Sequence, residues 1–448
     1  MNTTEACSQN SYKDSDIIWK KILYRIMPIL FMAYVFANLD RVNIGFAKAQ
    51  MSNDLSFSET VYGFGAGLLF ISYSLFAVPS NLALQRIGAR RWIAILMIAW
   101  GILSTCMFMV TTPMEFYVLR FLLGAAEAGF TPGIMYYITK NFPAHLRARV
   151  TAIFALGVPF SGIMGGPLSG WIIVSMHDFL NMHGWQWMFL IEGLPVVILG
   201  MVVMAALPDH ISQAKWLNQD EQRLVVASLD DKQESQKSSV AHVNILFNKY
   251  IWMLVAIYFC VRLAINTTSF WMPTFIHSTG IKNDAVVGLL TAIPYIFGAI
   301  FMYYLARSSD FKNERRWHLM SALILASLGM LLAGLFDTST FMTMVALTVL
   351  GMGSSAALSM FWLLPPQFMS RAALAAGLGL ISTFGSIASF VAPILIGWVR
   401  DTTNSSSLAL YILSGAILFG AFLVYLTPKQ YRPGGPQPLM PEEAKASS

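Results

Sequence analysis

The chain has 448 residues, of which 56% are hydrophobic and 12% are charged, and its mean hydropathy is +0.60. These values exclude a soluble globular domain, because such domains carry about twice this share of charged residues. The net charge of +6 does not indicate nucleic-acid binding, since the basic residues gather in short loops between apolar segments. The three cysteines, Cys7, Cys106 and Cys260, are scattered and predict neither a disulfide framework nor a metal site.

Twelve stretches are long and apolar enough for transmembrane helices, which need about 20 apolar residues. Each is continuously apolar, whereas the strands of a membrane barrel alternate. The expected spans are 22–45, 61–83, 92–111, 116–139, 150–174, 185–206, 250–274, 285–306, 317–336, 340–363, 374–398 and 407–427. The sequence therefore predicts an all-α membrane protein.

One long polar stretch, residues 207–249, divides the spans into six and six. It contains an amphipathic segment, 220–229, that we expect to form a short surface helix. The expected organisation is an N-terminal bundle (1–206), a cytoplasmic linker (207–249) and a C-terminal bundle with a cytoplasmic tail (250–448).

The two halves repeat short motifs at corresponding places. Gly88–Trp92 recurs as Asn313–Trp317, and Pro167–Trp171 recurs as Pro393–Trp398. A parallel six-plus-six repeat is typical of secondary transporters that rock two bundles about a site near the membrane midplane. The first repeated motif contains two arginines in each copy: Arg90 and Arg91, then Arg315 and Arg316. An acid, Asp310, precedes the second copy, whereas the corresponding place before the first copy holds a neutral residue.

The basic residues predict the orientation of the chain. The N-terminus and the loops after the second, fourth, eighth and tenth spans are rich in Lys and Arg, whereas the opposite loops hold only Lys48, Lys282 and Arg400. By the positive-inside rule, both termini are expected in the cytoplasm.

Two pairs of charged residues lie inside otherwise apolar spans, where charge is costly and usually marks a substrate or ion pathway. They are Asp40 and Arg41 in the first span and Arg120 and Glu127 in the fourth. A static ion pair between helices is the alternative interpretation. Asp40 and Arg120 are expected at similar depth, where they can pair. Asp40 and Arg41 are consecutive and point about 100° apart, so they cannot both serve one partner.

A proton-coupled anion carrier needs a fixed cation and an acid that binds protons. Arg suits the first role, because it stays charged and holds a carboxylate with two hydrogen bonds. Burial favours the neutral form of an acid such as Glu127, and a nearby Arg favours the charged form. Competition between Glu127, Asp40 and the substrate for cationic partners would link proton binding to substrate binding.

Several motifs resemble the major facilitator superfamily and, within it, the anion:cation symporter family of bacterial organic-acid permeases. The resemblance covers essentially the whole chain. It rests on Leu39–Ala47, Pro79–Asn81, Gly88–Trp92, Arg120–Phe130, Trp185–Gly193 and Phe361–Trp362.

This resemblance implies a multi-pass protein of the bacterial inner membrane. It implies that Asp40 and Glu127 serve the proton and that Arg41 binds the substrate anion. Similar permeases carry sugar acids such as galactonate, or tartrate, phthalate or 4-hydroxyphenylacetate, driven by protons. The motifs do not specify which carboxylate is carried.

Further candidates for the substrate site lie near the middle of their spans. Tyr73 is placed to donate a hydrogen bond to a carboxylate or hydroxyl, and Arg120 adds a cation to the N-terminal half. In the C-terminal half the candidates are Asn266, Trp362, Ser382 and Thr383, for which an ordinary packing role is the alternative.

Arg262 falls mid-span where the resembling permeases commonly have a neutral residue. It is expected to bind a second carboxylate, to pair with a structural acid, or to reach the membrane surface. Asn266 stands where many of these permeases have Tyr, which leaves the substrate open.

The sequence thus predicts a proton-coupled importer of an organic carboxylate, with an exchanger or uniporter as the alternative. An enzyme or sensor is disfavoured, because the loops hold no nucleophile–base set, metal cluster or signalling domain. His177, His183 and His277 are scattered in outer loops. The expected partners are a small carboxylate, protons and the bilayer; no cofactor and no nucleic acid is implied, and a monomer is expected.

Overall fold

The computed structural model describes residues 3–230, 248–369 and 371–427, with the backbone alone for 3–16, 144, 148, 230 and 371–376. Within these ranges the regular structure is helical, with no strand. This confirms the predicted all-α class.

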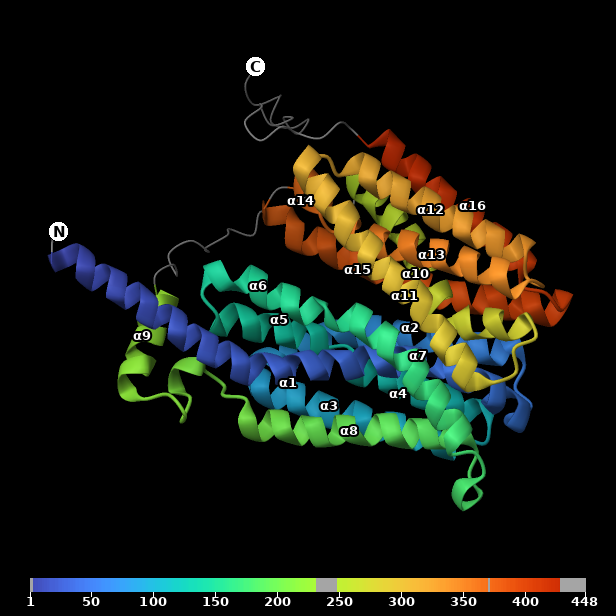
Figure 1. Ribbon diagram of the computed structural model, residues 1–448, viewed down its shortest axis with the longest axis horizontal. Helices are drawn as coiled ribbons and strands as arrows, with labels where there is room; N and C mark the ends of the chain where they lie inside the picture. The colour runs from blue at the N-terminus through green and yellow to red at the C-terminus, as the bar shows by residue number, and fades with distance from the viewer. Residues whose placement is uncertain (1–2, 231–247, 370, 428–448) are drawn as a thin grey trace.

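The helices form two bundles joined by a short surface helix (Figure 1). The first bundle comprises α1 (Thr3–Leu55), α2 (Glu59–Ile87), α3 (Ala89–Cys106), α4 (Pro113–Glu127), α5 (Phe130–Asn141), α6 (Ala144–Ala155), α7 (Gly157–Ser175) and α8 (Gly184–Ala206). The surface helix is α9 (Gln219–Asp230), at the predicted amphipathic segment. The second bundle comprises α10 (Lys249–Ser278), α11 (Asp284–Lys312), α12 (Arg316–Leu335), α13 (Thr340–Phe361), α14 (Pro365–Phe368), α15 (Arg371–Thr403) and α16 (Ser407–Leu426).

Eleven helical stretches of the described residues are long and apolar enough to cross a membrane. The difference from the twelve predicted spans arises at 116–139, which the structure divides into α4 and α5. Pro132 lacks the N–H that would bond the carbonyl of Ala128, so the helix breaks at Ala128 and Gly129. Pro159 has the same effect on Ala155, where α6 gives way to α7 within one continuous span.

The two bundles meet through α2 on α15 and α7 on α11, with α1 also on α10. These contacts gather at one end of the molecule, hereafter the sealed end. A Cβ at Gly63 would overlap the carbonyl of Pro393, and one at Gly170 would overlap that of Asp284. Glycine is therefore required there for the backbones to approach.

Polar contacts also join the two bundles at the sealed end. The Asp401 carboxylate accepts from the backbone N–H groups of Glu59 and Thr60 at 3.0 and 2.7 Å. Gln50 donates to Asp284 at 3.2 Å, and the Arg400 guanidinium lies 3.6 Å from the Glu59 carboxylate. This end is closed by both packing and hydrogen bonds.

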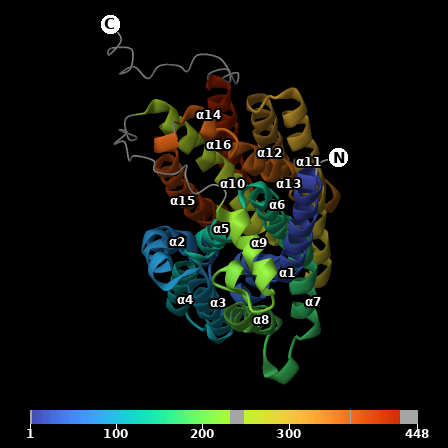
Figure 2. The same ribbon diagram turned by 90° about the vertical axis from the view of Figure 1, so that its left-hand side faces the viewer.

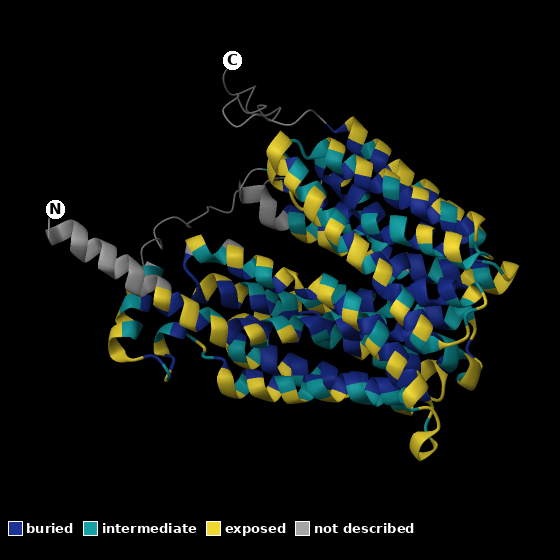
Figure 3. Cartoon of the chain, viewed as in Figure 1, coloured by how far each residue is buried: buried dark blue, intermediate teal, exposed yellow. Residues whose placement is uncertain are grey.

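The opposite end, hereafter the linker end, carries α9, α14 and the N-terminus (Figures 1 and 2). Here the helices of the two bundles diverge, at the left of Figure 1. Trp362 and Leu363, which follow α13 at this end, remain 37% and 39% exposed. Exposed and buried residues alternate along most helices (Figure 3), as expected for helices with one face on the core and another on lipid.

The repeated arginines close each bundle at the linker end. Arg90 donates to the Met204 carbonyl of α8 at 2.9 Å, and Arg316 donates to the carbonyls of Val424 and Tyr425 in α16. Arg315 pairs with Asp310 at 2.5 Å, so the predicted acid of the second copy is used within its own bundle.

Candidate functional site

The break between α4 and α5 places Glu127 deep in the first bundle. α4 begins behind a capping box, in which Thr112 accepts from the Glu115 backbone and Glu115 accepts from that of Thr112. This box fixes where α4 starts and so how deep its later residues lie. Glu127 is the last residue of α4 and is fully buried.

Arg41 and Glu127 form a short ion pair between α1 and α4. The Arg41 Nε lies 2.5 Å from Glu127 Oε2, and the second oxygen, Oε1, has no hydrogen-bond partner. The guanidinium carbon lies 5.3 Å from the centre of the Tyr73 ring. Tyr73 thus offers Arg41 its ring face, a contact that favours a cation.

Asp40 and Arg120 do not form the ion pair predicted from their depth. Asp40 is buried and accepts from Ser104 and, at 3.3 Å, from Asn43. Arg120 instead donates to the carbonyls of Gly65 and Ala66 in α2, at 3.3 and 3.5 Å.

The physical reason is the close packing of α2 on α4. A Cβ at Gly124 would overlap the Leu69 carbonyl, so the two helices touch through their backbones. The guanidinium of Arg120 meets the carbonyl oxygens of α2 before it reaches Asp40. It still lies within electrostatic range of Asp40 and Glu127, so it reduces the excess of negative charge in the bundle.

In the second bundle, Arg262 is held by neutral groups. Its Nε and Nη2 donate to the Ser389 hydroxyl of α15 at 3.0 and 2.9 Å. Asn266 donates to the same hydroxyl at 2.9 Å and to the Arg262 carbonyl at 2.6 Å. Among the ion pairs of the described residues none includes Arg262. It is therefore neither paired with a structural acid there nor extended toward the membrane surface.

Two tyrosines connect the two arginines across the bundle interface. Tyr34 of α1 lies within electrostatic range of both Arg41 and Arg262. Tyr258 of α10 lies within range of Arg262, Tyr34 and Tyr73. The Arg262 guanidinium also lies over the Phe70 ring of α2, 5.7 Å from its centre. The two guanidinium groups therefore face a common region between the bundles.

Trp362 joins this aromatic region, whereas Ser382 and Thr383 lie at its margin. The Trp362 ring centre is 5.0 Å from that of Tyr258. Ser382 and Thr383 are exposed on α15, and the Thr383 hydroxyl donates to the Gly379 carbonyl at 3.0 Å. Ser382 is seven residues before Ser389 and shares its helix face, so it lies nearer Arg262 than Thr383 does.

Three residues of this region, Tyr34, Tyr258 and Ser389, were not predicted from the sequence, nor was Glu192, which is buried within the first bundle beside Ser169. Tyr34 is seven residues before Arg41, and Tyr258 is four before Arg262, so helical spacing from each arginine would have found both. Glu192 is an acid in an apolar span, the same signal that singled out Glu127. Ser389 carries no signal of its own, because serine is common in the interior of membrane helices.

Two of the histidines called scattered lie together. His177, Asp178 and His183 place one ligand atom each within 4.8 Å of one another, and all three residues are exposed. His183 also lies 3.3 Å from Asp54, and His277 lies 3.0 Å from Asp284. These groups lie at the sealed end, away from Arg41 and Arg262.

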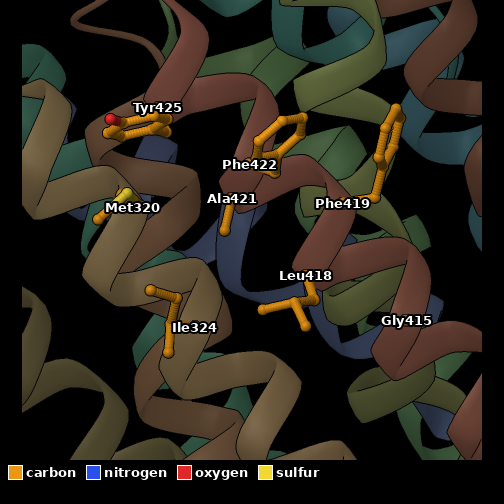
Figure 4. A pocket seen from close by; sticks show the side chains of 8 residues that line it. All are labelled: Met320, Ile324, Gly415, Leu418, Phe419, Ala421, Phe422 and Tyr425. Atoms are coloured by element: carbon orange, nitrogen blue, oxygen red, sulfur yellow. The ribbon is translucent and has the colours of Figure 1, made fainter.

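A hollow of about 520 Å³ lies between α12 and α16, apart from the charged residues (Figure 4). It is lined by Met320, Ile324, Gly415, Leu418, Phe419, Ala421, Phe422 and Tyr425. With no charged side chain in this lining, it suits an acyl chain and offers nothing to a carboxylate.

Comparisons with known proteins match the chain along most of its length. The family model described as "Major Facilitator Superfamily" matches residues 30–393 and 283–446. An Agrobacterium vitis protein named "Putative tartrate transporter" is 44% identical over 91% of this chain and 93% of its own length. A Pseudomonas putida protein named "Putative metabolite transport protein NicT" is 43% identical over 92% of this chain and 94% of its own.

A solved structure supports the same fold. The crystal structure of a D-xylose–proton symporter has a TM-score of 0.72 at 15% identity, covering 91% of this chain and 98% of its own. At this identity the likeness concerns the fold alone.

Proposed function

The chain belongs to the Major Facilitator Superfamily, and from that premise we propose that it imports an organic carboxylate together with protons. Like its relatives it is a transporter and a multi-pass membrane protein. The proposed cycle is alternating access, in which residues 1–206 and 250–448 rock about the region between Arg41 and Arg262, joined by the linker 207–249.

The observation that carries this proposal is the Arg41–Glu127 pair. Glu127 is fully buried and holds Arg41 at 2.5 Å, so a substrate carboxylate must compete with Glu127 for the guanidinium. A proton on Glu127 removes its charge and frees Arg41 for the substrate. Loss of that proton restores the pair and expels the anion. Proton and substrate are thereby carried in the same direction.

Asp40 is proposed as the second proton-binding acid. It lies beside Arg41 in the chain but faces Ser104 and Asn43 instead of a cation. A buried carboxylate without an ion-pair partner binds a proton readily. The positive charge of Arg120 acts on Asp40 and Glu127 and favours their ionised forms, so it opposes proton binding by Asp40.

The proposed substrate is a small dicarboxylate or a comparable sugar acid. Arg41 and Arg262 come from opposite bundles, and both act on Tyr34. One carboxylate on each guanidinium would draw the bundles together around the anion. The tartrate transporter named above is consistent with a hydroxylated dicarboxylate. Tyr73, Trp362, Asn266, Ser382 and Thr383 are proposed to contact its remaining groups.

We infer the orientation from charge. The basic loops adjoin the linker end, which the positive-inside rule assigns to the cytoplasm. The sealed end then faces the periplasm, and this conformation is open toward the cytoplasm. The proposed location is the bacterial inner membrane, with both termini inside and a monomer as the working unit.

Uptake by reconstituted protein tests the proposal. Proteoliposomes would receive labelled tartrate, or members of a carboxylate panel, under an inwardly directed proton gradient. We expect accumulation that a protonophore abolishes, and none in Arg41→Gln vesicles. Uptake that does not depend on the proton gradient, but that increases when the vesicles are loaded with a carboxylate, would identify an exchanger and refute proton coupling.

A further inference from the structure

The proton cycle described above leaves unused a third buried acid of the first bundle, Glu192. It lies in α8, within the apolar stretch Gly184–Ala206, and is 2% exposed. The Ser169 hydroxyl of α7 donates to Glu192 Oε1 at 2.7 Å. No ion pair among the described residues includes Glu192, whereas Glu127 pairs with Arg41.

Asn43 connects Glu192 to Asp40. The Asn43 side chain lies beside the Glu192 carboxyl group. Its Nδ2 also donates to Asp40 Oδ1 at 3.3 Å. Ser169, Glu192, Asn43, Asp40 and Ser104 thus form one buried polar chain across α7, α8, α1 and α3.

Three acceptor oxygens in this buried polar chain of side chains lack a hydrogen-bond donor. They are Glu192 Oε2, Asn43 Oδ1 and Asp40 Oδ2, and all three are buried. Unsatisfied acceptors of this kind are costly, and an ionised carboxylate can only add acceptors. A proton on Glu192 Oε2 supplies the missing donor, and Asn43 Oδ1 is the free acceptor beside it.

The surrounding charges also favour a neutral Glu192. α7 carries no ionisable residue, and α3 carries Arg90 and Arg91 only at its far end and Cys106 at its near end. From α1 the charged group that acts on Glu192 is Asp40, which is itself an acid. Arg41 and Arg120 act on Glu127 and Asp40, whereas neither arginine acts on Glu192; three acids against two arginines leave one negative charge, which one bound proton balances.

We propose that Glu192 is a proton-binding site linked to Asp40 through Asn43. This site extends the proposed function and rests on it: Glu192 keeps its proton while Asp40 exchanges one with the substrate region. Because ionising both carboxyl groups beside one amide is unfavourable, the pair retains at least one proton throughout the cycle. Glu192 is therefore the acid of the pair that retains its proton, and Asp40 is the acid that exchanges one.

Infrared spectroscopy of the purified full-length protein in lipid nanodiscs tests the site without substrate. We expect a carboxylic-acid C=O band that persists at neutral pH and is absent from Glu192→Gln. It should remain in Glu221→Gln, which removes an acid of the surface helix α9 that pairs with Lys21. Ser169→Ala should shift the band by removing a hydrogen bond, which also covers the case of a poorly folded Gln variant.

Two spectroscopic results would overturn the inference. One is an unchanged band in Glu192→Gln together with no shift in Ser169→Ala. The other is loss of the wild-type band on adding sodium, which would make the cluster a metal-cation site.

Transport measurements separate this inference from the proposed function. If wild-type vesicles accumulate tartrate with protons, Glu192→Gln should keep the pH midpoint of uptake, because Gln mimics an acid that retains its proton. A midpoint moved by about 1 unit or more would show that Glu192 exchanges its proton during the cycle; it would refute the retained proton and leave proton coupling intact. Wild-type vesicles without proton-driven uptake, but with the Glu192 band, would refute the coupling and leave the proton site intact.

Discussion

The two bundles repeat one architecture but carry charge in different ways. The first bundle buries three acids, Arg120 and Lys48, and its half-buried Arg41 pairs with Glu127. In the described part of the second bundle, Arg262 is the one charged side chain away from a helix end. Arginine does not lose its proton in proteins, so the second bundle offers a fixed charge and the first offers groups that titrate. We therefore expect the first bundle to bind the protons and the fixed charge of the second bundle to determine which substrates are accepted.

The largest expected effect follows from making Glu127 permanently neutral. Glu127→Gln mimics the protonated acid and leaves Arg41 without its competitor. Accumulation driven by a proton gradient should be lost, while exchange of labelled tartrate between the two sides should persist. Glu115→Gln, on the same helix at its exposed start, serves as the control and should behave as wild type. Full gradient-driven accumulation by Glu127→Gln would remove proton binding from this residue.

Arg41→Lys tests whether the first bundle also holds the substrate. Lysine keeps the charge but loses the planar fork that holds two carboxylate oxygens. Binding should weaken by about 1–3 kcal/mol, as for the loss of a charge-assisted hydrogen bond, so the Kd should rise roughly 5- to 150-fold. The measurement is tartrate binding by calorimetry, with Arg147→Lys in the α6 segment as control. An unchanged Kd in folded Arg41→Lys would assign the carboxylate to another cation.

Arg262→Gln tests whether the second bundle determines which substrate is transported. It removes a cation that neutral groups hold in place. Transport of a dicarboxylate should fall at least about tenfold, the equivalent of 1.4 kcal/mol, while a monocarboxylate keeps its rate. Arg307→Gln, exposed at the end of α11, is the matched control. Equal losses for both substrates, with a lowered melting temperature, would make Arg262 structural.

Much of the fold was predictable, because it depends on properties that a sequence states directly. The length of each apolar run gives the spans, and the polar stretch 207–249 gives the division into halves. The division of the fourth span was missed, although Pro132 and Gly129 are visible in the sequence. Proline in a membrane helix often leaves only a bend, so its presence alone did not indicate that the helix would be interrupted at Ala128 and Gly129.

The charged residues of the site were predictable, but their partners were not. Helix direction and position placed Asp40 and Arg120 at similar depth, whereas the structure pairs Arg41 with Glu127. The expected Asp40–Arg120 pair was wrong because partner choice depends on how α2 and α4 rotate and how closely Gly124 lets them approach. The Ser389 contact of Arg262 joins residues 127 positions apart, and no local pattern encodes it.

The smallest expected effect concerns the contact between the bundles at the sealed end. Asp401 is exposed and accepts from two backbone N–H groups at the start of α2, across the interface. Asp401→Asn removes the charge and one acceptor, at a cost of about 0.5–1 kcal/mol, because solvent screens exposed contacts. The population open at this end should therefore rise only about 2- to 5-fold.

Spin labels at Asn53 and Lys282, exposed on either side of the contact, would report this opening as a longer distance between the two labels. Asp337→Asn, whose carboxylate accepts from Ser407 within the second bundle, should leave the distances unchanged. If the Asp401 variant also left them unchanged, glycine packing alone would hold this end, and the two bundles would separate there without an electrostatic latch.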